Sequence, residues 1–220
     1  MMKKRIGCIL GGVVIVVITL QMAGCRATEL EERCFPLVVA VNYEEEQDAV
    51  SFCAGFPRVD NSGSGKTNEL QVSTEVSGSF ADSKKEYEKN LNKIPDYNHL
   101  KVLVLGEKLV DNMVAYDEML ETLAKTEEFP RNTYVCVVDD VEELLEIDKE
   151  LPQDVGTYLE EFLNNHEAKK NRMLTLGDLL DEQENQDMIL YAPYLEIDDS
   201  YVEWGGYYAI GLNVPPEDLE

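Results

Sequence analysis

Residues 62–67, Ser-Gly-Ser-Gly-Lys-Thr, contain the residue types with which proteins bind nucleotide phosphates. A phosphate-binding loop has a glycine five positions before its Gly-Lys-Thr ending and is followed by a helix. Here the corresponding position is Asp60, and residues 69–76 alternate between apolar and polar, which is typical of a strand. Residues 60–65 are therefore interpreted as a flexible turn between two strands, and no nucleotide is expected to bind.

Cys25 is the second candidate for chemistry, because it follows a segment with the three parts of a secretion signal. Three basic residues lie within residues 1–5, an apolar run follows to Leu20, and small residues precede Cys25. This order predicts a lipoprotein signal peptide over residues 1–24, cleaved before Cys25, which then carries the lipid. Two acyl chains are sufficient for stable anchoring, so the protein is expected at the extracytoplasmic face of a membrane, where nucleotides are scarce.

The charge of the chain excludes a further class of partner. The 220 residues contain 19 Lys and Arg against 44 Asp and Glu, for a formal net charge of −25. Removal of the signal, with its three basic residues, makes the remainder still more acidic. Such a surface repels nucleic acid, so none is expected as a partner. The acidic residues are spread along the chain, which favours solvated faces over one cation site.

Cysteines and histidines provide no catalytic or metal-binding pattern. Cys34, Cys53 and Cys136 remain besides Cys8 and Cys25, and none has metal-ligand spacing. A disulfide between Cys34 and Cys53 is one alternative, and free buried thiols are the other. The two histidines, at positions 99 and 166, lack the neighbours of a hydrolase or a metalloprotease motif. No enzyme activity, metal or cofactor is therefore expected.

The remaining pattern predicts one domain of mixed α+β/α/β class, with a mixed β-sheet and flanking helices. The boundaries are a signal peptide over 1–24, a polar tether over 25–34, the domain over 35–212 and a tail over 213–220. Within 99–147 the order strand, helix, strand, helix indicates parallel strands, and a capping box is expected at Asp139. The other expected strands are 37–41, 49–59, 69–76, 188–197 and 201–212, and the other expected helices are 79–93, 154–167 and 175–183.

The C-terminal strand pair is rich in aromatic residues, among them Tyr201, Trp204 and Tyr207. One interpretation is a packed sheet face, because aromatic residues favour strands. The other is a partner-docking surface, because exposed Tyr and Trp are frequent at interfaces. Gly205-Gly206 in the same strand indicates a bulge or the close approach of a partner backbone.

Four phrases, taken in order, resemble the N-terminal domain of the spore-germination lipoproteins, the Ger(x)C family. They are the acidic stretch 29–33 after the lipid-attachment cysteine, Ser-Gly-Ser-Phe at 77–80, the segment 99–109 and the segment 130–135. The chain departs from the family at Arg26-Ala27, where a Trp-Asp pair is usual. It also ends at Glu220, where family members continue into further domains.

The resemblance implies a role that the residues alone do not indicate. Such proteins are the C subunits of germinant receptors on the spore inner membrane, where they work with integral-membrane A- and B-type subunits. They act as non-enzymatic assembly or signalling modules in nutrient-triggered germination. The alternative is a solute-binding lipoprotein of a transporter, although two lobes around a cleft are hard to build from 195 residues.

Overall fold

The computed structural model of the 220-residue chain describes residues 30–57, 74–147, 151–167, 173–184, 189–198 and 201–210. The described residues from Cys34 onward belong to one compact unit. Before it, a 3-10 helix η1 (Leu30–Glu32) leads into β1 (Arg33–Cys34). The segment expected to be a tether thus contains regular structure in its last five residues. The expected turn at 60–65 and the expected tail at 213–220 lie outside the described residues.

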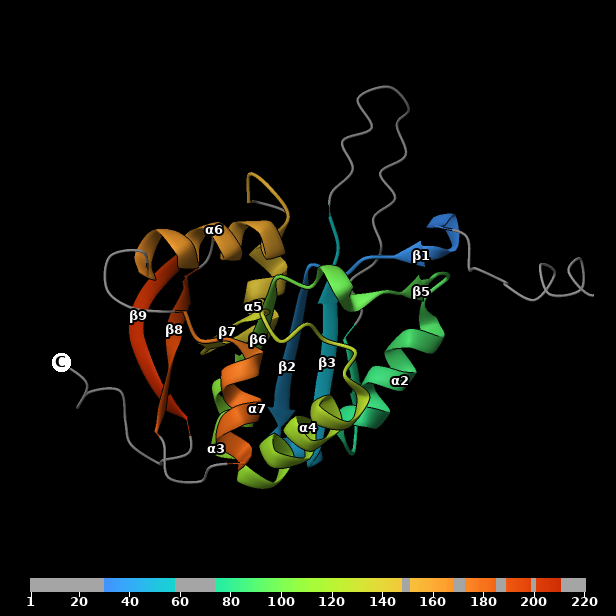
Figure 1. Ribbon diagram of the computed structural model, residues 1–220, viewed down its shortest axis with the longest axis horizontal. Helices are drawn as coiled ribbons and strands as arrows, with labels where there is room; N and C mark the ends of the chain where they lie inside the picture. The colour runs from blue at the N-terminus through green and yellow to red at the C-terminus, as the bar shows by residue number, and fades with distance from the viewer. Residues whose placement is uncertain are drawn as a thin grey trace, which may run out of the picture. The chain divides into compact units, whose positions relative to one another are not determined.

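A seven-stranded mixed sheet forms the centre of the domain (Figure 1). Its strand order is β4-β3-β2-β6-β7-β8-β9. The four middle strands β2, β6, β7 and β8 run parallel, and an antiparallel neighbour flanks this group on each side. The strands are β2 (Val38–Glu44), β3 (Ala49–Gly55), β4 (Glu75–Ser77), β6 (Val102–Gly106), β7 (Tyr134–Val138), β8 (Leu190–Asp198) and β9 (Tyr201–Ile210). The prediction of a mixed sheet with flanking helices is confirmed.

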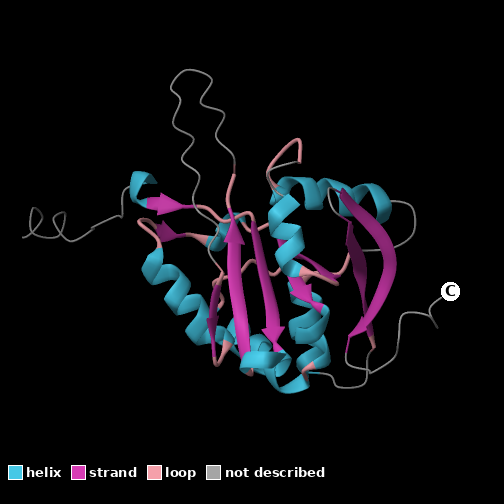
Figure 2. Cartoon of the chain, turned by 180° about the vertical axis from the view of Figure 1, so that it is seen from behind, coloured by secondary structure: helices cyan, strands magenta, loops and turns pink. Residues whose placement is uncertain are grey.

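Helices cover both faces of the sheet, as the two opposite views show (Figures 1 and 2). Side chains of one face pack with α2, α3, α4 and α7, and those of the other face pack with α5 and α6. Strands buried on both faces need apolar residues at every position, which explains the continuous runs at β6 and β7. The helices are α2 (Phe80–Asn90), α3 (Glu107–Asp111), α4 (Met113–Thr126), α5 (Val141–Glu146), α6 (Val155–Glu167) and α7 (Leu176–Glu184).

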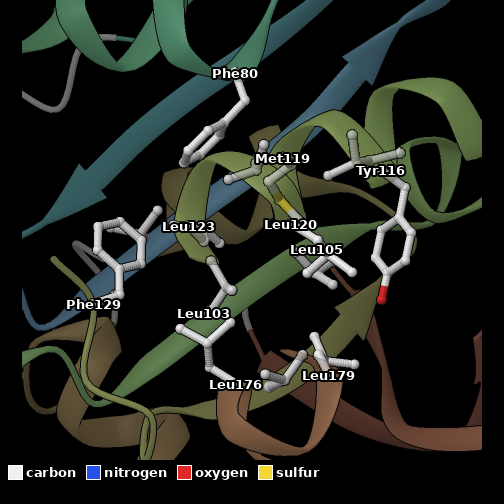
Figure 3. Close-up of a cluster of buried hydrophobic side chains, with 14 of the residues drawn as sticks. Phe80, Leu103, Leu105, Tyr116, Met119, Leu120, Leu123, Phe129, Leu176 and Leu179 are labelled. Atoms are coloured by element: carbon white, nitrogen blue, oxygen red, sulfur yellow. The ribbon is translucent and has the colours of Figure 1, made fainter. Parts of the chain in front are cut away.

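The larger of the two cores lies beneath α2, α4 and α7. Leu103 and Leu105 of β6 point into it and meet Met119 of α4, while Leu176 of α7 closes one side (Figure 3). All four side chains are at most 1% exposed. The neighbouring β6 residues Val102 and Val104 belong to the other core, as the alternation of a strand requires.

Several boundaries differ from the sequence expectations for local reasons. The helix after β7 is capped by Asp140, whose Oδ1 accepts hydrogen bonds from the Glu142 and Glu143 amides, so the expectation of a cap at Asp139 was wrong. Asp139 instead accepts from the Ile197 amide of β8 at 3.2 Å. The strand expected from position 99 begins at Val102. His99, which was expected to begin this strand, instead ends the 3-10 helix η3 (Tyr97–His99). The Leu100 amide donates a hydrogen bond to the Tyr97 carbonyl there.

The first predicted helix also ends early, and short elements take up the residues beyond it. α2 ends at Asn90, after which β5 (Ile94–Pro95) forms a two-stranded sheet with β1. The Cys34 carbonyl accepts a hydrogen bond from the Asp96 amide at 2.8 Å. Strands of two residues have too few positions for a periodic pattern, so neither was expected from the sequence.

A β-bulge interrupts the pairing of β8 with β9, as Gly205-Gly206 indicated. Tyr194 pairs with Gly206 whereas Leu195 pairs with Trp204, so Gly205 is the extra residue. Gly206 has a φ of +114°, a conformation that residues with a Cβ rarely adopt. The extra residue reverses which side chains of β9 point to which face of the sheet. Before the bulge, Val202 and Trp204 face the α6 core, whereas after it Tyr208 and Ile210 face the opposite core.

We expect Gly206→Ala to lower the free energy of unfolding by about 1–3 kcal/mol, because alanine is strained at this φ. Gly78→Ala is the matched control, since a Cβ at Gly78 meets nothing within 4 Å and its φ is not positive. The control should stay within about 0.5 kcal/mol of the wild type. Urea unfolding of both variants measures the difference, and equal stabilities would contradict the assignment of the bulge.

Candidate functional site: an aromatic surface on the last strand

Five rings from α6 and β9 form a continuous series of contacts, which we call the aromatic surface. Tyr158 lies 6.0 Å from Phe162, and Phe162 lies 4.2 Å from His166, between ring centroids. His166 stacks on Trp204 at 5.3 Å with an interplanar angle of 3°, and Trp204 meets Tyr207 edge to face at 5.5 Å. The series thus passes from the helix to the last strand of the sheet.

The aromatic surface is neither a buried core nor a set of isolated rings. His166 is exposed and the other four rings are half-buried. Tyr158, Phe162 and Trp204 rest with their inner sides on the core beneath α6. Contiguous, partly exposed Tyr and Trp side chains held rigidly in this way are typical of protein-binding surfaces.

Two features of the sequence place these rings together. Residues 158, 162 and 166 are spaced by four, so they share one face of α6. The helix is held near the start of β6 by Lys101, the residue before that strand. Its Nζ lies 2.8 Å from Glu160 Oε2 and 3.2 Å from Thr157 Oγ1. On β9, the bulge puts Tyr207 on the same face as Trp204.

Of the three predicted docking residues, the structure brings Trp204 and Tyr207 together but not Tyr201. Tyr201 is 45% exposed and its hydroxyl donates to Asp198 Oδ2 at 2.8 Å. The register of the hairpin places it on the opposite face of β9, together with Glu203. The sequence prediction missed Tyr158, Phe162 and His166, although their four-residue spacing was the signal that would have identified them.

A second pair of tyrosines joins β8 and β9 to α3. The Tyr194 hydroxyl donates to Glu107 Oε2 at 3.1 Å, and the Tyr208 hydroxyl donates to Asp111 Oδ1 at 2.6 Å. The two rings lie 5.7 Å apart. Burial raises the pKa of the Tyr208 phenol above its ordinary value, and the hydrogen-bonded carboxylate of Asp111 raises it further. These contacts fix the hairpin to the rest of the domain.

We expect Tyr208→Phe to lower the free energy of unfolding by about 1–2 kcal/mol at neutral pH, because Asp111 loses a charge-assisted hydrogen bond. A raised pKa in the folded state stabilises the protein fully below the ordinary phenol value of 10.0 and less as pH rises above it. The difference between wild type and variant should therefore shrink above about pH 10. Denaturant unfolding at neutral and alkaline pH measures it, and a difference that widened would contradict this contact.

The described cysteines are poor nucleophiles. Cys34, Cys53 and Cys136 are free and buried, so the alternative of a Cys34–Cys53 disulfide is not what this structure contains. Burial raises the pKa of both Cys53 and Cys136 to about 12, which keeps these thiols protonated at neutral pH. His99, the other histidine, is exposed and packs edge to face against Phe35.

No group of three or more His, Cys, Asp or Glu side chains in the part of the chain that the structure describes is arranged to hold a metal ion. None of the helices there is long and apolar enough to cross a membrane. The predicted signal peptide and the predicted lipid-attachment site Cys25 lie outside the described residues.

The fold is a mixed α/β domain with an aromatic surface formed by α6 and β9. Comparison with known proteins supplies the family. Residues 26–197 match the family described as the spore germination protein N-terminal domain, and the chain belongs to that family.

A solved structure described as the crystal structure of the GerBC protein is similar at 17% sequence identity, with a TM-score of 0.37. The match covers 78% of this chain and 47% of that chain, so this chain spans about half the length of that relative. No curated protein matches the chain.

Proposed function

We propose that this chain is a membrane-anchored, non-enzymatic component of a spore germinant receptor, equivalent to its C subunit. The observation that carries the proposal is the family match over residues 26–197, in a family described by its role in spore germination. The component acts in assembly or signalling during nutrient-triggered germination. Its partners are the integral-membrane A- and B-type subunits.

The position of the family match supports a lipid anchor. The matched region begins at residue 26, directly after the cysteine that the sequence predicts to be lipidated. A diacylated Cys25 holds the domain at the extracytoplasmic face of the membrane, which is the spore inner membrane for a receptor of this kind. There the aromatic surface meets the extracytoplasmic parts of the partner subunits.

The chemistry of the described side chains supports a role in binding. The aromatic surface has the composition of an interface, whereas the three thiols are buried and protonated. His166, one of two histidines, contributes its ring to this surface and donates a hydrogen bond from Nδ1 to the Phe162 carbonyl oxygen.

Spores from a strain that lacks this gene test the proposed function. They should lose the germination response to at least one nutrient, and the wild-type gene should restore it. A gene with Trp204→Ala and Phe162→Ala should restore it poorly, although the protein accumulates to normal amounts. Unchanged germination of the null spores with every nutrient tested would overturn the proposal.

A further inference from the structure

The last strand of the sheet has one neighbour only among the described residues. β9 lies at the end of the strand order and pairs with β8 through nine residue positions. No strand of the described residues pairs with its other side, and a sheet edge of this kind is a template for a further strand. β9 has ten residues, which is long for a strand, and the bulge interrupts it only at Gly205-Gly206.

The two faces of β9 have different chemistry on either side of this edge. Trp204 and Tyr207 lie on one face and belong to the aromatic surface. On the opposite face of the β8–β9 hairpin lie four exposed side chains, which we call the acidic face. They are Glu196, Asp198, Tyr201 and Glu203.

The acidic face contains an unfavourable pair. Glu196 of β8 lies directly opposite Glu203 of β9, and both carboxylates are exposed. Like charges directly opposite one another destabilise an antiparallel pair. A positive charge placed beside Glu203 by an adjacent strand would relieve this repulsion.

We propose that β9 binds an extended segment of another polypeptide as an eighth strand of the sheet, and that this segment alternates apolar with basic residues. Main-chain hydrogen bonds to β9 provide affinity, and alternate side chains provide specificity. The apolar side chains pack on Trp204 and Tyr207, while lysine or arginine side chains reach Glu203 and Glu196. The inference names the partner chemistry for the docking role proposed above and rests on that role.

A second copy of this chain does not fit the same edge. Its β9 would bring another Glu203 to the acidic face, and the formal net charge of −25 adds repulsion between two copies. Charge complementarity therefore favours a basic segment of a different polypeptide.

The chain contains a direct reporter, because Trp204 is its single tryptophan. The full chain, in non-ionic detergent, is titrated with an eight-residue peptide of alternating valine and lysine, and the emission of Trp204 is recorded. We expect a saturable change. A peptide of alternating valine and glutamate should bind at least about tenfold more weakly, as should the valine–lysine peptide after N-methylation of the amides along one edge.

Two charge-reversal variants distinguish binding at the β9 edge from a general attraction of the basic peptide to an acidic protein. Glu203→Lys should weaken binding of the valine–lysine peptide by at least about tenfold, whereas Glu46→Lys, the same change at an exposed residue on η2 (Glu45–Gln47), should not change it. Equal binding to both variants, or equal binding of the N-methylated peptide, would overturn the strand-addition proposal. Because the assay uses no germination partner, its failure would leave the spore phenotype to test the proposed function separately.

Discussion

Phe52→Ala is expected to lower the free energy of unfolding by about 3–5 kcal/mol, the usual cost of removing a fully buried phenylalanine. Phe52 of β3 is 0% exposed and lies between two rings of α2. Its ring centroid is 5.8 Å from that of Phe80 and 5.2 Å from that of Tyr87. Domains are stable by about 5–15 kcal/mol in total, so this single change removes a large share.

Denaturant unfolding measures the effect, with Val76→Ala as the control. Val76 lies on β4, the strand adjacent to β3, but is 40% exposed. Its truncation should cost less than about 1 kcal/mol, because little apolar area leaves water on folding. If the two variants were equally stable, α2 would not pack on β3 as described.

Cys25→Ala is expected to abolish lipid attachment, the second large effect. In sporulating cells fed a labelled fatty acid, the wild-type protein should take up label and the variant should take up none. The variant should also accumulate as an uncleaved precursor or leave the membrane fraction, because the lipidated cysteine is the proposed anchor.

Cys8→Ala is the matched control for this experiment. Cys8 lies in the apolar run of the predicted signal peptide and is removed with it, so the variant should be labelled and cleaved like the wild type. A Cys25→Ala protein that matured, took up label and stayed in the membrane would refute the lipoprotein prediction.

The central strands were predictable because burial on both faces leaves a continuous apolar run. This pattern marked β6 and β7 and correctly indicated that they run parallel. The short helix α3 was not predicted, since its five residues are too few to show a period and its position is set by packing of Leu109 beneath the sheet. Asp139 and Asp140 are both good capping residues, and the sequence does not show that Asp140 caps the helix while Asp139 accepts a hydrogen bond from the distant Ile197 amide.

The sequence predicted one part of the candidate site, the aromatic residues of the last strand, but not which of them lie together. Aromatic residues in the last strand suggested an interface, and Gly205-Gly206 indicated the bulge. Which aromatic residues share a face depends on that bulge, since one extra residue separates Tyr201 from Tyr207 and joins Tyr207 to Trp204. The stacking of His166 on Trp204 joins segments almost forty residues apart, and no local pattern contains this information.

Affinity capture tests the proposed receptor role most directly. The tagged protein is purified from gently solubilised membranes of sporulating cells, and the proteins that accompany it are identified by mass spectrometry. We predict a pair of polytopic germination subunits with the wild type, and much less of them with the Trp204→Ala and Phe162→Ala double variant. Recovery of transporter permeases, or of no reproducible membrane partner, would contradict a role in a germinant receptor and would favour a solute-binding lipoprotein instead.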